Sequence, residues 1–374
     1  MKILMINLPF FGHTNPTLPL TEKLIQRGHT VVYINAEQFR EAIEKTGAKF
    51  IPYKDYPTNP SEKEKKKLCF MAAYHTALSM TETFDLLIYE MFFYPGIEIA
   101  KRKHIPCVRQ FSQSAWSDET FKDTTFIFKM SAKLIDIQVL PKSKTEKLGF
   151  ENHCLIDGIL KSKPELNIVY VPDSFQNKRE SFDETYLFIV PKPEIQKSDI
   201  VIPYEKMKHP IIYISLGSII SNKNFCMKCI KSFGDTEFSV ILNIAKVPIE
   251  SLGKIPENVY VYNYVPQIEV LTHTDVFLTH CGMNSVNEAL WYGVPMVAMP
   301  IINDQLENGK RIEALGIGKK IRAVMNSGTN LYKAACEVYA NKEMKKKAVE
   351  ISEKLKKQIS MDEVVDRIEQ IKVP

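Results

Sequence analysis

Short apolar runs alternate with amphipathic segments of helical length in the first part of the chain, and this alternation limits the fold more than any other feature. The runs are apolar on both faces, which is typical of parallel strands that helices cover on both sides. We therefore predict an α/β domain built from βαβ units. The predicted strands are 2–8, 30–35, 49–52, 85–89, 107–111, 167–171 and 186–190, and the predicted helices are 16–27, 36–46, 61–83 and 96–103.

The alternation stops between residues 190 and 210 and then starts again. This stretch, VPKPEIQKSDIVIPYEKMKHP, has four prolines and no regular period, which is typical of an interdomain linker. Beyond it, strands are predicted at 211–216, 238–243, 259–262, 275–279 and 295–299, and helices at 222–234, 284–292, 304–314 and from about 328. We therefore predict two doubly wound, Rossmann-like domains that face a central cleft. The domains are 1–200, with a linker at about 191–210, and 211–374, whose final helices can pack back on the first domain.

Composition and charge exclude several classes of protein. The 374 residues carry a net charge of +5, but the basic residues are spread widely and the densest cluster, 62–67, mixes both signs. This distribution does not favour a nucleic-acid surface. The sequence starts on a predicted strand and contains no apolar run of about 18 residues, so we expect no signal peptide and no stable membrane insertion. Seven cysteines without framework spacing favour a cytoplasmic location, and the pair Cys226 and Cys229 is assigned a structural role.

The first predicted strand leads into FGHTNP, residues 11–16. Open α/β sheets bind their ligands at such strand-to-helix joints, and dinucleotide-binding proteins place GxGxxG there. This chain has a single glycine, Gly12, followed by His13, which argues against a dehydrogenase. Because histidine titrates near neutral pH, His13 can take a proton from a substrate hydroxyl. The alternative is an ordinary loop histidine.

The strongest functional signal lies in DVFLTHCGMNSVNEALWYGVPMVAMPIINDQ, residues 275–305. A strand ends on a histidine, a glycine permits a tight turn, and an Asn-Ser pair is expected to cap a helix that starts there. The free N–H groups of such a helix end favour a phosphate, and a glutamate one turn further can accept from ribose hydroxyls. A capped helix with a core histidine would explain these residues separately, but not their coincidence. They are His280, Gly282, Asn284, Ser285 and Glu288.

This stretch resembles the sugar-nucleotide signature of the family 1 glycosyltransferases, the UDP-glycosyltransferases of GT-B fold. YVPQ at 264–267 and HCGMNSVNEALWYGVPMVAMPIINDQ at 280–305 follow that signature in order and spacing. FGHTNP, with RGH at 27–29, resembles the N-terminal motif of the bacterial macrolide-type members, and the segments at 85–95 and 215–218 (SLGS) fit as well. The resemblance covers nearly the whole chain and implies a GT-B glycosyltransferase.

The resemblance also implies a donor site in the second domain. An aromatic residue, usually Trp, stacks on uracil at the position of Tyr264, and the smaller Tyr leaves dTDP-sugars open as donors. Met283 replaces a frequent Trp, which we expect to matter little because its backbone N–H acts there. The implied ligands are Tyr264, Val265 and Gln267 for the nucleoside; Ser218, His280, Asn284 and Ser285, with Gly282 in the turn, for the diphosphate; Glu288 for the ribose; and Asp304 and Gln305 for the sugar hydroxyls.

Catalysis is expected from a histidine–carboxylate pair in the first domain. His13, as the base, needs a carboxylate on a neighbouring strand end to fix its tautomer and stabilise the imidazolium. Glu90 ends the fourth predicted strand, where the family usually has Asp. The chain has no Asp-x-Asp sequence, so we expect a helix dipole, His280 and backbone donors to stabilise the departing diphosphate with no metal and no other cofactor. We predict a single displacement that inverts an α-linked sugar to a β-glycoside.

The sequence says least about the acceptor. The aromatic stretch 111–150 predicts either the wall of an apolar pocket or a cap of loops and helices. The predicted acceptor-pocket residues are Phe11, Phe111 and Trp116. We expect a monomer or homodimer that transfers a sugar, with glucose the first choice, from a UDP-sugar to a small hydrophobic acceptor of the macrolide, polyketide or phenolic class.

Three other functions stay open at this point. A glycolipid or cell-wall-precursor glycosyltransferase of the same fold would have an apolar, basic membrane-docking face on the first domain. A sugar-nucleotide epimerase would have acid–base carboxylates in the cleft. A non-catalytic partner subunit that only binds a nucleotide sugar would lack the base.

Overall fold

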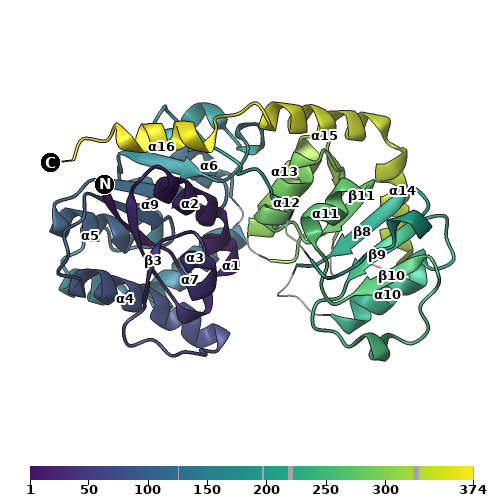
Figure 1. The fold of residues 1–374 in the computed structure, drawn as a ribbon, viewed down its shortest axis with the longest axis horizontal. Helices are drawn as coiled ribbons and strands as arrows, with labels where there is room; N and C mark the ends of the chain where they lie inside the picture. Colours follow the sequence, from purple (N-terminus) through teal and green to yellow (C-terminus); the bar gives the residue numbers. More distant parts are fainter. Residues whose placement is uncertain (125, 196–197, 218–221, 303, 323–327, 374) are drawn as a thin grey trace. The chain divides into compact units, whose positions relative to one another are not determined.

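The computed structural model describes the chain except for residues 125, 196–197, 218–221, 303, 323–327 and 374. The chain forms two compact units, shown in Figure 1. The first consists of Met1–Pro191 together with Gln358–Pro374, and the second of Lys192–Lys357. The sequence analysis assigned the C-terminal residues to the second domain, with final helices that can pack back on the first; in the structure Gln358–Pro374 are part of the first unit.

The first unit is built on a seven-stranded sheet in the order β3-β2-β1-β4-β5-β6-β7. All neighbouring strands are parallel. The strand order reverses between β1 and β4, and ligands of open α/β sheets bind outside the carboxyl ends of strands at such a reversal. The strands are β1 (Lys2–Ile6), β2 (Thr30–Asn35), β3 (Lys49–Pro52), β4 (Leu86–Glu90), β5 (Cys107–Phe111), β6 (Leu166–Val169) and β7 (Tyr186–Phe188).

Helices connect the strands of the first unit, and the central strands are buried on both faces, as their apolar sequences predicted. The joint after β1 differs from the prediction. Residues Phe11–Thr14 themselves form a helical turn, and Pro16 lies in the short 3₁₀ turn that follows. The helices are α1 (Phe11–Thr14), α2 (Leu18–Gln26), α3 (Arg40–Glu44), α4 (Glu62–Ser79), α5 (Pro95–Lys103), α6 (Asp118–Lys122), α7 (Phe126–Gln138), α8 (Lys142–Lys147), α9 (Leu155–Leu160) and α16 (Met361–Glu369).

The C-terminal helix α16 is held in the first unit by apolar packing and by ion pairs. Its buried residues Val364, Val365 and Ile368 belong to the core of that unit. On its other side, Arg27 at the end of α2 lies 2.7 Å from carboxylate oxygens of both Asp366 and Glu369. The buried apolar face contributes most of the stabilisation, because exposed ion pairs are screened by solvent.

The second unit repeats the design with a six-stranded parallel sheet in the order β10-β9-β8-β11-β12-β13. Here the strand order reverses between β8 and β11, so the loops after these two strands mark the expected ligand site. The strands are β8 (Ile211–Ser215), β9 (Ser239–Asn243), β10 (Val259–Tyr262), β11 (Val276–Thr279), β12 (Met296–Ala298) and β13 (Gly318–Lys320). The helices are α10 (Lys223–Phe233), α11 (Gln267–Thr272), α12 (Met283–Trp291), α13 (Asp304–Ala314), α14 (Gly328–Ala340) and α15 (Lys342–Leu355).

The predicted α/β class with two doubly wound parallel sheets is confirmed. The sequence pattern gave no residue ranges for α6, α7, α8 and α9 of the first unit or for β13 and α11 of the second. Strand β13 is only three residues long and contains two lysines, so it has no apolar run of its own. Helix α11 is six residues long, which is too short for a helical period to stand out.

Candidate active site

The turn that carries His13 is fixed by buried polar residues at the carboxyl ends of β1 and β2. The side-chain amide of Asn7 donates to the carbonyl oxygen of His13 over 2.9 Å. The hydroxyl of Thr14 donates to the Leu8 carbonyl over 3.2 Å and accepts from the Asn35 amide over 3.0 Å. Asn7, Thr14 and Asn35 are fully buried. This network sets where the His13 backbone lies, so the imidazole has a defined starting point.

The structure brings His13 and Glu90 together. Glu90 is the last residue of β4, which pairs with β1, so the two side chains meet at the strand-order reversal. His13 Nδ1 lies 3.1 Å from Glu90 Oε1. The Glu90 side chain is fully buried, and that of His13 is 25% exposed. A carboxylate at Nδ1 favours the tautomer whose lone pair is on Nε2, so the imidazole can take up a proton on Nε2. The Glu90 carboxylate then stabilises the positive charge of the imidazolium.

The chain after β4 supports this pair in a way that the sequence analysis missed. The second Glu90 oxygen accepts a hydrogen bond from the backbone N–H of Phe92 over 3.1 Å. The rings of Phe10 and Phe92 each lie 5.4 Å from the His13 imidazole. The two phenylalanines that follow Glu90 in the sequence were a usable signal, because aromatic side chains next to a strand-end carboxylate limit its access to water.

The three predicted acceptor-pocket residues lie in different environments. Phe11 is 51% exposed and packs edge-on against Phe39. Trp116 is buried, with its ring 5.8 Å from that of Phe92. Phe111 does not fit the prediction, because it is fully buried in the core of the first unit, 6.1 Å from the Tyr186 ring. A strand-end aromatic residue in a parallel sheet is covered by helices, so its position in the sequence did not make it accessible.

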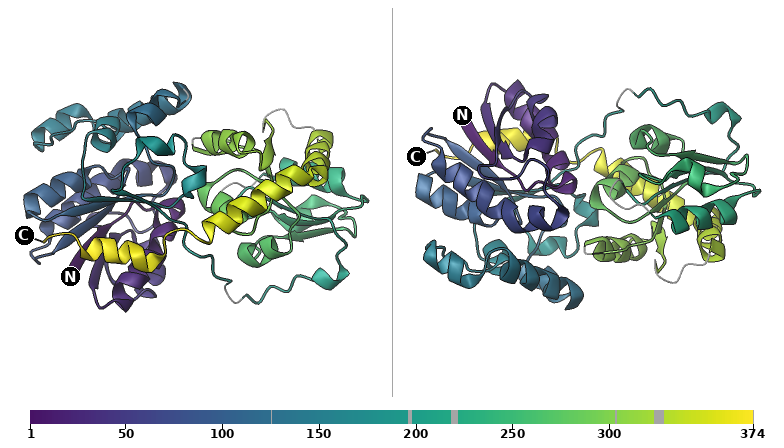
Figure 2. Two further views of the ribbon diagram at one scale, coloured as in Figure 1. Left: turned by 90° about the horizontal axis from the view of Figure 1, so that it is seen from above. Right: turned by 90° about the horizontal axis from the view of Figure 1, so that it is seen from below.

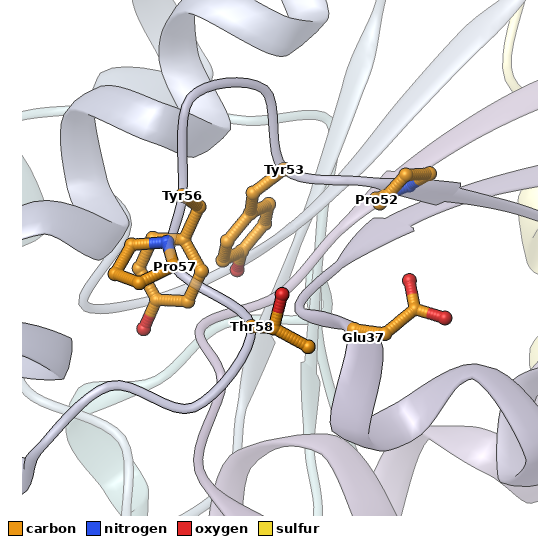
Figure 3. A pocket seen from close by; sticks show the side chains of 6 residues that line it. All are labelled: Glu37, Pro52, Tyr53, Tyr56, Pro57 and Thr58. Atoms are coloured by element: carbon orange, nitrogen blue, oxygen red, sulfur yellow. The ribbon is translucent and has the colours of Figure 1, made fainter.

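A cavity of about 370 Å³ opens where β2 and β3 end, at the same edge of the sheet (Figure 3). The rings of Tyr53 and Tyr56 meet edge to face in its wall, with centroids 5.2 Å apart. The Tyr53 hydroxyl donates to the carbonyl oxygen of Asn7, which ties this wall to the turn that carries His13. No sequence motif marks the cavity. It is lined by Glu37, Pro52, Tyr53, Tyr56, Pro57 and Thr58.

In the second unit, the loop between β11 and α12 presents an uncapped helix start. The predicted side-chain caps are wrong: α12 begins at Met283, Gly282 is its N-cap residue, and no side chain caps it. Asn284 and Ser285 therefore lie in the first turn of the helix. Uncapped N–H groups carry the positive end of the helix dipole, which makes this end better suited to an anion than the predicted capped one.

His280 lies against two glycines at this helix start. A Cβ atom on Gly282 would lie 2.6 Å from His280 Nε2, and one on Gly217 would lie 2.8 Å from His280 Cε1. The imidazole position therefore requires both residues to lack a side chain. Burial lowers the pKa of His280 to about 4, so the ring is neutral at pH 7. Its Nδ1 atom is buried with no hydrogen-bond partner among the described residues, which is costly unless a ligand supplies one.

Gln267, Ser285 and Glu288 are joined by hydrogen bonds. The Gln267 amide donates to the Ser285 hydroxyl over 3.1 Å and also to the Glu288 carboxylate. Burial raises the pKa of Glu288 to about 7, although the Gln267 donor opposes this shift. Tyr213 of β8 was not predicted as a site residue; its hydroxyl donates to the Gln267 side-chain carbonyl oxygen over 2.9 Å and fixes the amide orientation.

The other predicted donor-site residues lie between β10 and α11 and at the start of α13, except for one that is outside the described residues. Tyr264 is 59% exposed, as a ring available for stacking should be, and its neighbour Val265 is buried. Gln305 is buried near the start of α13, and its carbonyl oxygen accepts from the backbone N–H groups of Ile301 and Ile302. Only its NH₂ group is therefore left for a ligand. Asp304 is the first residue of α13, and Ser218 lies outside the described residues.

Comparison with known proteins identifies the family. Residues 201–369 match the sequence model of the family described as UDP-glucoronosyl and UDP-glucosyl transferase. The chain is 30% identical over 360 residues to the NDP-glycosyltransferase YjiC of Bacillus subtilis (strain 168), and the alignment covers 91% of this chain and 90% of that protein. The chain belongs to the UDP-glycosyltransferase family.

Two further relatives agree with this assignment. This UDP-glycosyltransferase is 27% identical to the demethyllactenocin mycarosyltransferase of Streptomyces fradiae, over 83% of this chain and 73% of that one. Its fold is similar to the solved structure of the glycotransferase of kitacinnamycin, with a TM-score of 0.83, 26% identity and coverage of 99% and 98% of the two chains. The protein is a glycosyltransferase of GT-B fold, as the resemblance implied.

Two features of the described residues bear on membranes and metals. None of the helices there combines the length and the apolar character that crossing a bilayer requires. Within the same residues, no three His, Cys, Asp or Glu side chains are grouped so that they could hold a metal ion. Independence from metals stays a prediction, which chelation can test.

Proposed function

We propose that this glycosyltransferase moves a sugar, with glucose the expected one, from a UDP-sugar to a hydroxyl group of a small apolar natural product, with inversion at the anomeric carbon. The observation that carries the proposal is the pairing of His13 Nδ1 with Glu90 Oε1 at 3.1 Å, with Glu90 fully buried. A buried carboxylate behind a partly exposed imidazole is the arrangement that a general base requires. A sugar-nucleotide-binding subunit without activity would have no need of it.

In the proposed reaction, the acceptor O–H proton moves to Nε2 of His13 as the acceptor oxygen bonds to the anomeric carbon. The bond between that carbon and the β-phosphate oxygen breaks in the same step, and UDP leaves with the electron pair. Glu90 stabilises the imidazolium that forms, since the two charges are opposite and water is excluded from the carboxylate. A single displacement of this kind inverts an α-linked donor to a β-glycoside.

The leaving group is proposed to lie at the start of α12. Its uncapped N–H groups and a neutral His280 N–H would donate to the diphosphate oxygens, where negative charge grows in the transition state. Donors fixed before the reaction need no reorganisation, and this supports catalysis without a metal. Asn284, Ser285 and Ser218 are proposed to complete the diphosphate contacts.

The remaining donor contacts follow from the arrangement of the second unit. Glu288, oriented by Gln267, is proposed to accept from the ribose hydroxyls. Tyr264 is proposed to stack on the base, beside the backbone of Val265. Asp304 and the NH₂ group of Gln305 are proposed to bind hydroxyls of the transferred sugar.

The acceptor is proposed to be a macrolide, polyketide or phenol. Support comes from two similar proteins whose names mention such products, a mycarosyltransferase of demethyllactenocin and an oleandomycin glycosyltransferase. Aromatic side chains around His13 and the Tyr53–Tyr56 wall of the cavity would suit a ring-containing aglycone.

The test is transfer from UDP-glucose to a panel of phenols and macrolides, read by mass spectrometry of the products. We expect saturable UDP binding in calorimetry and unchanged rates in the presence of EDTA. Proton NMR of the product should show the β-anomer. Loss of activity on chelation, or an α-linked product, would overturn the proposed mechanism.

A second prediction concerns Glu288 and pH. Because its pKa is raised to about 7, the free protein holds a proton there below that pH, whereas ribose hydroxyls donate best to the charged form. Ligand binding should therefore release a proton, and affinity should rise by up to about tenfold per pH unit as the pH increases toward 7, then level off. Uridine is the suitable probe, since phosphate groups titrate in the same range.

Uridine binding is measured by calorimetry at pH values between about 5.5 and 8, a range that spans the shifted pKa of Glu288. Each pH value is measured in two buffers with different ionisation enthalpies. Glu288→Gln should bind uridine with an affinity that does not change with pH. An equally steep pH profile in Glu288→Gln would show that another group releases the proton.

A further inference from the structure

Helix α7 of the first unit exposes apolar side chains on one face. Met130, Leu134 and Ile137 are 42%, 47% and 68% exposed, respectively. At 3.6 residues per turn, these three positions fall within about 60° of one another around the helix axis. They therefore form one stripe, which we call the α7 stripe, and not three scattered surface residues of the kind that need no explanation.

The α7 stripe is not a core face that lacks its partner, because the opposite face of the helix is already packed. Ala132 on that face is buried. Asp136 on the same face accepts a hydrogen bond from the backbone N–H of Leu155, the first residue of α9, over 2.7 Å. Burial raises the pKa of Asp136 to about 6. One face of α7 packs on α9, so the α7 stripe on the opposite face is available to a partner outside this unit.

The surroundings of the stripe are basic. Residues 126–147 contain five lysines and two acidic residues. Both acidic residues already have partners. Asp136 accepts from the backbone of α9, and Glu146 Oε1 lies 3.7 Å from Lys142 Nζ. Lys133 on α7 and Lys144 on α8 are exposed. In Figure 2, the blue-teal helices of this region lie at the outer edge of the first unit, away from its sheet.

We propose that α7 docks the enzyme reversibly on an anionic lipid surface, with the α7 stripe in the interfacial layer and the lysines of α7 and α8 on the headgroups. An apolar stripe beside lysines matches both parts of such a surface, the acyl chains and the negative charge. A second protein copy would bring the same excess of lysines to the contact, which disfavours a symmetric dimer through this face. Docking would bring the enzyme to acceptors dissolved in the bilayer, a consequence that rests on the proposed function.

The first experiment is sedimentation of the full-length protein with vesicles of phosphatidylcholine, with and without phosphatidylglycerol. We expect binding to the vesicles that contain phosphatidylglycerol, and release at high salt, because the headgroup contacts are screened. Equal binding to both vesicle types, or none to either, would overturn the proposal. UDP binding is measured in the same preparations, so a failure of the proposed function is seen separately.

The second experiment compares variants. Leu134→Glu should weaken vesicle binding at least about tenfold, since a charge replaces the centre of the apolar stripe. Lys133→Gln should weaken it by about fivefold, the value of one lysine near an anionic surface. The matched control is Val349→Glu on α15, where a residue that is 38% exposed receives the same charge. Light scattering completes the test: a dimer that Leu134→Glu dissociates would make the stripe a subunit interface and the proposal wrong.

Discussion

Replacing His13 with Ala is expected to lower the transfer rate by about 10²–10⁴-fold, the usual contribution of a positioned general base. UDP binding should persist, because the proposed donor contacts come from the second unit. The loss should appear in kcat more than in the donor KM, since the proton moves only in the transition state. Strongly acidic phenols should be the least affected acceptors, as their protons leave without help.

The measurement is the transfer rate against acceptor pKa for the wild type and for His13→Ala. His75→Ala is the matched control, because His75 is an exposed histidine of α4 in the same unit. Glu90→Gln should show a smaller defect of the same kind, since the imidazole stays but its charged form loses the carboxylate. If His13→Ala were as active as the wild type on an aliphatic alcohol, His13 would not be the base.

The sequence predicts the fold well where local pattern and tertiary structure agree. Strand β4 and its neighbours are apolar on both faces because helices cover both sides of a parallel sheet, so the pattern is strong. The attachment of α16 to the first unit has no such signal. Its apolar positions Val364, Val365 and Ile368 predict a buried face, but nothing local says which core receives it. Long-range pairing of this kind is decided by the whole chain.

The candidate site also contains residues that the local sequence predicts and residues that only the folded chain brings together. His280, Gly282 and Glu288 lie close together in the sequence, so their chemistry could be interpreted from one stretch. Tyr213 meets Gln267, the first residue of α11, only in the folded unit, because the two are 54 residues apart in the sequence. Within its own apolar strand Tyr213 looks like any core residue. The left-handed backbone of Cys281, with φ of 68°, could not be predicted either, because cysteine has no preference for it. The Asn308 side chain, which donates to the Cys281 carbonyl over 3.0 Å, helps hold that turn.

Replacing Gly282 with Ala is expected to weaken UDP binding by about 10²–10³-fold while the protein stays folded. The backbone at Gly282 has φ of −63°, which alanine adopts without strain, so the effect is steric. The added methyl group would meet His280 Nε2 at 2.6 Å, and the imidazole must move. A side-chain end can move at little cost in stability, but the displaced ring loses its place beside the α12 N-terminus. The expected loss corresponds to one or two hydrogen bonds to a charged group, at about 1.5–3 kcal/mol each.

Calorimetry with UDP measures this loss, and a double-mutant cycle assigns it to the ring. His280→Ala removes the atom that the methyl group would meet, so Gly282→Ala combined with His280→Ala should bind UDP about as well as His280→Ala alone. Gly12→Ala is the matched control for UDP binding, because a Cβ atom there has nothing within 4 Å and the residue lies in the other unit. Additive losses in the double variant would mean that the methyl group blocks the ligand directly. The start of α12 and His280 would then contribute to UDP binding independently, and displacement of the ring would not explain the loss in Gly282→Ala.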